Sequence, residues 1–178
     1  MSIINTILLV LACILLVLLI VAALVKKDFR LEKQVVINKP KQQVYNYMKM
    51  IRNQEQYSVW VMKDPNIKLV YTGTDGTVGF KSAWESNDKN VGIGEQEIIK
   101  LSEGESMDVE IRFQKPFVAT NYAHNELTAI SDVQTKLVQA FTGSSKYPMN
   151  VMNLFMDSLV GKAMQQNLQN LKNNIEKL

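Results

Sequence analysis

The sequence predicts an α+β protein in which one long apolar helix precedes a soluble domain of antiparallel strands and a C-terminal helix. Of the first 25 residues 22 are apolar and none is charged, whereas 61 of the remaining 153 are apolar. Short strand-like stretches separated by turn residues fill the middle of the chain, and a helical stripe fills its end. With 178 residues, the chain has room for one ordinary domain. We therefore predict an anchor over residues 1–27 and a domain over 28–178.

The N-terminal stretch is long enough to cross a bilayer. Ile7 to Val25 is an unbroken apolar run, and a helix of this length spans roughly 30 Å, the thickness of the hydrocarbon core. A cleavable signal peptide would have a basic start and a shorter apolar run of about 7–15 residues, and the segment before Ile7 has no Lys or Arg. A lipoprotein signal is disfavoured because only apolar residues follow Cys13 up to Val25. The sequence predicts an uncleaved single-pass anchor that contacts the lipid bilayer through residues 3–25.

Three cations set the expected orientation of the anchor. Lys26, Lys27 and Arg30 flank its C-terminal end, and no charged side chain flanks the other end. Cytoplasmic flanks of membrane helices are enriched in Lys and Arg. The sequence thus predicts a soluble domain in the cytoplasm.

The soluble domain begins with a strand and one or two short helices. Residues 30–37 are extended in character and end at Asn38-Lys39-Pro40, and Pro40 suits the first turn of a helix. Further strands are predicted at residues 67–72, 78–85, 94–101, 107–113, 120–128 and 135–142. Residues 107–113 alternate apolar and polar side chains, which is typical of a half-buried antiparallel strand. Strands joined by short turns in this way predict a meander.

The C-terminal helix shows two kinds of apolar residue. Leu168, Leu171 and Ile175 recur at helical spacing, so we predict that they pack in the core. Residues 150–156 are richer in apolar side chains and are expected to be buried, with Met152 and Met156 at the mouth or lining of a cavity because flexible Met side chains adapt to different ligands.

Composition excludes several classes of function. One Cys and one His leave no disulfide framework and no Cys- or His-rich metal site, and a net charge of +3 does not favour nucleic acid. No nucleophile elbow, zinc-protease motif or phosphate-binding loop is present. Glu95 and Glu97 share a solvated strand face, and His124, near Asn125 and Glu126, is expected on the surface. We predict no catalytic residue, no metal and no cofactor.

Large apolar side chains are spread over separate elements that converge if the sheet curls around the C-terminal helix. For any one of them ordinary core packing is the simpler interpretation, but together they suit an adaptable apolar cavity. The cavity candidates are Tyr57, Trp60, Trp84, Phe113, Phe141, Met152, Phe155 and Met156.

Five segments in the same order resemble the SRPBCC superfamily, which includes START, Bet v 1 and bacterial polyketide cyclase/dehydrase-like proteins. They are VVINKPKQQVYNYM (Val35–Met48), YSVWVMKDPN (Tyr57–Asn66), GTVGFKSAWESN (Gly76–Asn87), GIGEQEI (Gly92–Ile98) and NLFMDSLVGKAMQQNLQNLK (Asn153–Lys172). The resemblance covers about residues 30–176. It implies a helix-grip fold, in which a curved antiparallel sheet of about six or seven strands surrounds the C-terminal helix and encloses a cavity.

Three functions follow as hypotheses. The first is a membrane-anchored domain that binds a hydrophobic small molecule or lipid without transforming it. The second is a cyclase- or dehydratase-like enzyme acting on an apolar substrate, although the chain shows no catalytic Arg, Tyr and His set like that of the aromatase/cyclases. The third is a protein-interaction or stress-response module. The partners that we predict are the bilayer and the apolar ligand, with no nucleic acid and no named protein partner.

Overall fold

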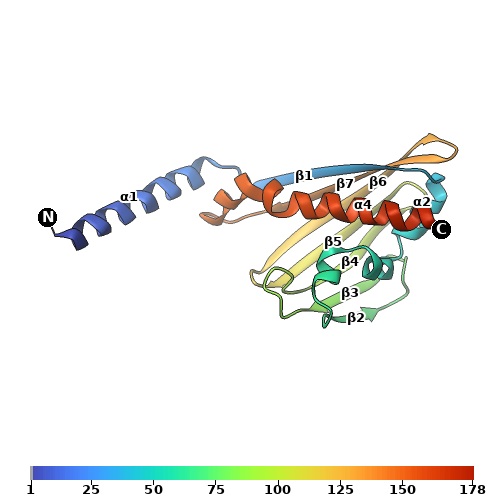
Figure 1. Ribbon diagram of the computed structural model, residues 1–178, viewed down its shortest axis with the longest axis horizontal. Helices are drawn as coiled ribbons and strands as arrows, with labels where there is room; N and C mark the ends of the chain where they lie inside the picture. Colours follow the sequence, from blue (N-terminus) through green and yellow to red (C-terminus); the bar gives the residue numbers. More distant parts are fainter. Residues whose placement is uncertain (1) are drawn as a thin grey trace.

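The computed structural model describes residues 2–178 and contains a long apolar N-terminal helix. Helix α1 spans Ile3–Leu24 and begins where the Ser2 hydroxyl accepts a hydrogen bond from the Asn5 backbone N–H. It projects away from the rest of the protein (Figure 1). It is the one helix in the described residues long and apolar enough to cross a membrane, and only 6% of its most apolar window is buried, so it is not a core helix.

The domain is built on one seven-stranded antiparallel sheet, which confirms the predicted α+β class. Its strands lie in the order β1-β7-β6-β5-β4-β3-β2, so all neighbours except β1 and β7 are consecutive in the chain. The meander from β2 to β7 therefore closes on the first strand. The strands span β1 Asp28–Ile37, β2 Lys68–Thr72, β3 Lys81–Glu85, β4 Ile93–Ser102, β5 Ser106–Lys115, β6 Ala119–Ser131 and β7 Gln134–Ser144.

Helices cover one face of this sheet. Between β1 and β2 lie α2 (Lys41–Met48), the 3₁₀ turn η1 (Ile51–Gln56) and α3 (Val59–Lys63). After β7 come the 3₁₀ helix η2 (Met149–Phe155), the π turn η3 (Asp157–Gly161) and α4 (Lys162–Lys177). Figure 1 shows α4 running across the sheet alongside β1, with α2 at its C-terminal end. The curved sheet that grips the last helix is the predicted helix-grip fold.

The core lies between α4, α2 and the inner face of the sheet. Leu168, Leu171 and Ile175 are at most 2% exposed, which confirms the predicted helical stripe. They join a cluster that includes Ile37 and Leu137 from adjacent strands. The far end of the domain, away from α1, is therefore solidly packed.

Two elements differ from the sequence prediction. The strand expected from residue 78 begins at Lys81, because Gly79 has φ +88°, a left-handed conformation that extends the preceding turn. In the stretch 150–156, which was expected to be buried, only Asn150 is buried, and Met152, Leu154 and Phe155 are exposed. Residues three apart share a face of a 3₁₀ helix, and in η2 the shared face that turns inward carries Asn150 and Asn153. Leu154 and Phe155 are therefore turned outward, and Met149 and Met152 are also exposed.

Candidate functional site: an apolar cavity between the sheet and helix α4

A cavity of about 1150 Å³ lies between the inner face of the sheet, the α3 segment and the start of α4. Seven of the eight predicted cavity residues line it: Tyr57, Trp60, Trp84, Phe113, Phe141, Met152 and Met156. They come from six different parts of the chain, and the sheet's curvature brings them together. Leu168 and Leu171, predicted as core, also form part of the wall.

Phe155 is the predicted residue that the structure does not bring to the cavity. Its side chain is 55% exposed and lies outside the lining, next to the equally exposed Leu154. It occupies the last position of η2, where the chain passes into the π turn η3. The change of helical geometry ends the face that Met149 and Met152 turn toward the cavity.

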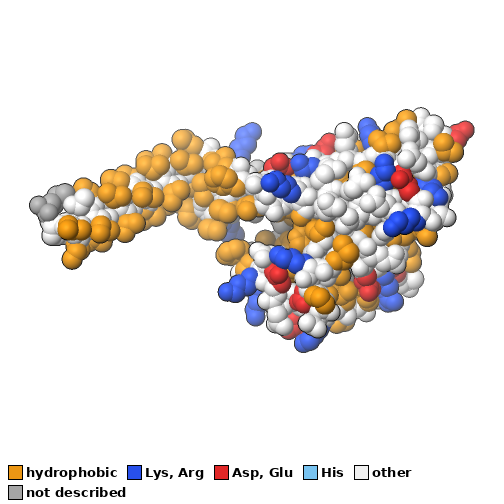
Figure 2. Space-filling view, in the orientation of Figure 1, with side chains coloured by type: hydrophobic (Ala, Val, Ile, Leu, Met, Phe, Trp, Pro, Cys, Tyr) orange, Lys and Arg blue, Asp and Glu red, His pale blue; other side chains and the backbone are white. Residues whose placement is uncertain are grey.

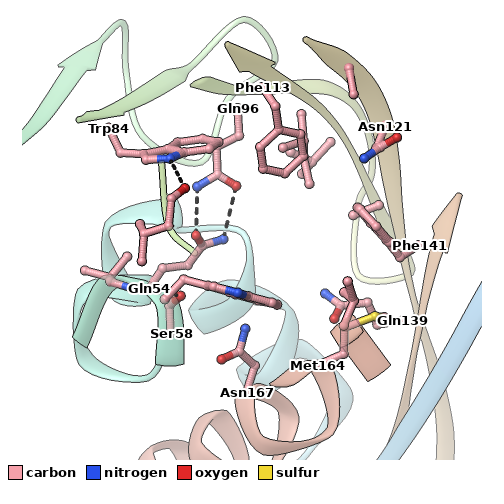
Figure 3. A pocket seen from close by; sticks show the side chains of 18 of the residues that line it. Gln54, Ser58, Trp84, Gln96, Phe113, Asn121, Gln139, Phe141, Met164 and Asn167 are labelled. Atoms are coloured by element: carbon pink, nitrogen blue, oxygen red, sulfur yellow. Dashed lines mark hydrogen bonds between the residues drawn. The ribbon is translucent and has the colours of Figure 1, made fainter. Parts of the chain in front are cut away.

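The aromatic wall depends on a glycine beneath the indole. Trp84 on β3 pairs with Gly94 on β4, and a Cβ at Gly94 would stand 2.6 Å from the Trp84 ring. The absence of a side chain lets the ring approach the strand backbone. The Trp84 Nε1–H donates to the Val91 carbonyl at 3.2 Å, and the ring meets Phe113 edge to face at 5.7 Å. Trp84 is thus fixed as part of the wall (Figure 3).

The cavity also contains uncharged hydrogen-bonding groups. Asn125 on β6 donates to the Met107 carbonyl at 3.3 Å and accepts from Gln139 Nε2 at 2.8 Å. Asn121, four residues earlier on the same inward face, is 9% exposed and lines the cavity, and its side-chain amide has no hydrogen-bond partner within residues 2–178. Figure 3 shows Asn121 and Gln139 with Phe141 on the same side of the cavity. A bound molecule can therefore satisfy the Asn121 amide.

A pair of amides on the opposite wall holds η1 to the sheet. Gln96 Nε2 on β4 donates to Gln54 Oε1 at 2.7 Å, and Gln54 Nε2 donates back at 3.4 Å (Figure 3). On the α4 side, Asn167 Oδ1 accepts from the Val59 backbone N–H at 2.7 Å. These bonds position α3 and with it Trp60. The polar groups here are already paired and serve the wall rather than a ligand.

Ionisable groups on the cavity wall remain neutral or lie at its rim. Burial raises the pKa of the Tyr57 hydroxyl well above its usual value, so the phenol stays protonated. Burial and a hydrogen bond to Glu55 raise the pKa of Tyr71 in the same way; its hydroxyl donates to Glu55 Oε1 at 2.6 Å. Glu55 and Lys146, the charged members of the lining, are exposed. The interior of the cavity is therefore uncharged.

The acidic residues and the histidine considered from the sequence lie on the outer face of the sheet. His124 pairs with Asp108 of the neighbouring strand, not with Asn125 or Glu126, because the register places Asp108 directly opposite it. Glu95 and Glu97 are bound by Arg112. The side chains of His124, Asp108, Glu95 and Glu97 do not line the cavity.

Arg112 is the centre of this outer network. Its guanidinium donates to Glu95 and Glu97, each at 2.7 Å, and contacts Glu110 on its own strand. The hydrogen bond from Arg112, helped by Lys81 at 3.5 Å, holds the pKa of Glu97 below its usual 4.5. One cation thus compensates three carboxylates from two adjacent strands.

Replacing Arg112 by Gln should lower the free energy of unfolding at neutral pH by about 1–2 kcal/mol, because three neighbouring carboxylates lose their shared cation. A lowered pKa stabilises the fold fully above the unfolded value, and this contribution is lost as pH falls through the folded value. The difference between wild type and R112Q should consequently shrink below about pH 4. Denaturant titrations at pH 7 and pH 3.5 measure it, and an equal difference at both values would contradict the electrostatic account.

No group of three or more His, Cys, Asp or Glu side chains in residues 2–178 is placed to hold a metal ion. The cavity wall itself offers amides, hydroxyls and aromatic rings. Its chemistry suits recognition of a neutral molecule by shape and by one or two hydrogen bonds.

Sequence reasoning missed the amides and the loop at the cavity mouth. Asn121 and Asn125 alternate with outward residues of β6 and share the inward face with Ala123 and Leu127. Polar residues on an otherwise apolar strand face are the signal that could have identified them. Phe117 and Val118, in the loop between β5 and β6, also line the cavity, and only the closure of the sheet places them there.

Comparison with known proteins identifies the fold. No protein-family model and no curated protein matches the sequence. Among solved structures, a truncated norcoclaurine synthase from Thalictrum flavum superposes with a TM-score of 0.68 at 8% identity, over 85% of this chain and 95% of that one. The ZhuI aromatase/cyclase from Streptomyces sp. R1128 gives 0.63 at 10% identity, over 84% and 94%. Ara h 8.0201 gives 0.57 at 12% identity, over 85% and 99%.

These similarities confirm the predicted SRPBCC, or Bet v 1-like, fold of the soluble domain. At such low identity they establish the architecture alone. The matched proteins include both enzymes and Ara h 8.0201, so the function of this chain has to be argued from its own cavity.

Proposed function

We propose that this protein is a membrane-anchored binding domain that holds one uncharged apolar molecule, a lipid or a small hydrophobic compound, in the cavity between the sheet and α4. The observation that carries the proposal is the cavity itself. Its volume of about 1150 Å³ exceeds the roughly 300–1,000 Å³ typical of small-molecule sites. A space of this size is much larger than the voids of a packed core.

The chemistry of the wall defines the class of ligand. Apolar and aromatic side chains form most of the surface, which favours a hydrophobic body. The unpartnered Asn121 amide favours one neutral polar group, such as a hydroxyl or carbonyl. A carboxylate or phosphate deep in the cavity is disfavoured because no cation lies there to offset its loss of hydration.

Anchoring supports the same function. An apolar ligand is concentrated in the bilayer, and a domain tethered by α1 is held beside that reservoir.

The basic residues after α1 favour a domain on the cytoplasmic side: Lys26, Lys27 and Arg30. Protease digestion of inverted and right-side-out vesicles tests the orientation, and cleavage of the domain in right-side-out vesicles would contradict it.

Extraction tests the binding function. The full chain, purified in lipid nanodiscs, should yield a neutral apolar molecule at about one copy per chain in native mass spectrometry, beyond the lipids of matched empty discs. The two tryptophans both line the cavity, so their emission should be quenched when 1-N-phenylnaphthylamine is added. A chain that carries no molecule and binds no probe has a cavity without a ligand, and the proposal would fail.

One observation favours an enzyme as the second candidate. Glu55 and Tyr71 are hydrogen-bonded at the rim of the cavity and could act as a proton-transfer pair on a substrate that enters there. Such a role predicts that Glu55→Gln leaves ligand affinity unchanged and abolishes conversion of the extracted molecule. A ligand recovered unaltered after prolonged incubation with the wild-type chain would rule this candidate out.

A further inference from the structure

Exposed apolar side chains surround the open end of the cavity. We call them the mouth patch: Phe117, Val118, Met149, Met152, Leu154 and Phe155. Val118 is 89% exposed and Phe117 68%, which is unusual for large apolar residues placed together. Phe117, Val118, Met149 and Met152 also line the cavity, so the cavity opens through this patch.

The mouth patch adjoins the end of the apolar helix. Asn150 Nδ2 donates to the Ala22 and Val25 carbonyls at 2.6 and 2.8 Å, and Asn153 Nδ2 donates to the Lys26 and Lys27 carbonyls at 3.0 and 2.8 Å. The bonds from Asn150 satisfy carbonyls that the end of a helix leaves without partners. They fix η2 against the last turn of α1. If α1 spans a bilayer, η2 lies at the level where the hydrocarbon core ends.

This contact explains the reversed polarity of η2. Its polar face, with Asn150 and Asn153, turns toward the end of α1 and the residues that follow it. Leu154 and Phe155 turn outward, and Met149 and Met152 stay exposed where they line the cavity. In water such an arrangement exposes several large hydrophobic side chains at a cost. Figure 2 shows hydrophobic side chains that cover α1 and continue onto the end of the domain that joins it.

Basic residues flank the same surface. Four exposed lysines are Lys26, Lys27, Lys115 and Lys146. Lys115 precedes Phe117 by two residues, and Lys146 precedes Met149 by three. Within residues 2–178, none of these four lysines forms an ion pair; the ion pairs involve other lysines. Cations beside an apolar surface match the anionic headgroups above a hydrocarbon core.

We infer that the mouth patch is seated in the interfacial layer of the bilayer that holds α1, so that the cavity opens onto lipid and not onto water. The inference rests on the proposed anchoring and deepens the proposed binding function. An apolar ligand then passes between the leaflet and the cavity without crossing water. The partner of this surface is the lipid itself.

Depth-dependent quenching tests the seating of the patch. In the full chain carrying Cys13→Ala, which removes the only native Cys, Val118→Cys or Phe155→Cys is labelled with the NBD fluorophore and reconstituted in nanodiscs of phosphatidylcholine and phosphatidylglycerol. Val133→Cys is the matched control, because Val133 is 66% exposed in the β6–β7 turn at the opposite end of the sheet (Figure 1). Phosphatidylcholine with a 5-doxyl chain should quench the labels at 118 and 155 and leave the label at 133 unchanged.

The outcomes separate this inference from the binding function. Labels at 118 and 155 that are no more quenched than the label at 133 would overturn the seating, even if 1-N-phenylnaphthylamine quenches the cavity tryptophans in the same discs. Strong quenching at 118 and 155 without any probe binding would establish the membrane surface and remove the binding function.

If the patch is seated in lipid and the cavity binds the probe, Phe117→Asp should slow the transfer of a lipid-dissolved ligand into the cavity at least tenfold. The stability of the domain should be unchanged because residue 117 is exposed.

Discussion

Replacing Ala123 by Phe should weaken the binding of an apolar ligand at least tenfold, a loss of about 1.4 kcal/mol in binding free energy. Ala123 lies on β6 opposite Phe141 and lines the cavity, so the added ring enters the space that the ligand needs. Because the ring extends into an existing cavity rather than a filled core, the fold should tolerate it. Titration of the tryptophan emission with 1-N-phenylnaphthylamine measures the change.

A matched control lies on the same strand. Ala129→Phe places the same ring six residues farther along β6, at an exposed position that does not line the cavity. It should leave affinity and stability unchanged. Equal affinity in both variants and the wild type would mean that the ligand binds elsewhere, whereas equal loss in both would indicate a general disturbance of the strand.

Some features of the cavity wall could be predicted from the sequence pattern and others could not. Periodicity predicted the α4 stripe and the alternation of β5, because both depend only on which side chains share a face. Seven of the eight candidates chosen for their large apolar side chains line the cavity, since such groups on separate elements converge once the sheet curls. The inner polar groups were missed because the alternation of β6, which places Asn121 on the same face as Ala123 and Leu127, was not used to look for polar residues on an apolar face.

Contacts between distant segments account for the remaining differences. The partner of His124 is set by the register between β5 and β6, and Asp108 is sixteen residues away in the chain. The orientation of η2 depends on segments more than a hundred residues earlier, because Asn150 binds the Ala22 carbonyl of α1 and Asn153 binds the Lys27 carbonyl just after it. An apolar stretch normally predicts burial in the protein. Here the helix that it contacts is itself apolar and exposed, so the same composition marks a surface.

Replacing Ile175 by Ala should cost about 2–5 kcal/mol in the free energy of unfolding, because the side chain is fully buried and its removal leaves a cavity in the packed end of the domain. Leu171→Ala should cost a similar amount but also enlarges the ligand cavity, whose wall Leu171 shares. Ile175 does not line that cavity, so I175A should lower stability and leave ligand affinity unchanged.

The complementary variant is Met156→Ala, which removes a partly exposed side chain from the cavity wall. It should lower stability by less than I175A and weaken ligand binding more, since a flexible Met at the mouth adapts to the bound molecule. Denaturant unfolding and probe titration of the two variants side by side measure both quantities. If both substitutions destabilise the domain equally and neither changes affinity, Met156 is part of the structural core, and the ligand does not reach the end of the cavity next to α1.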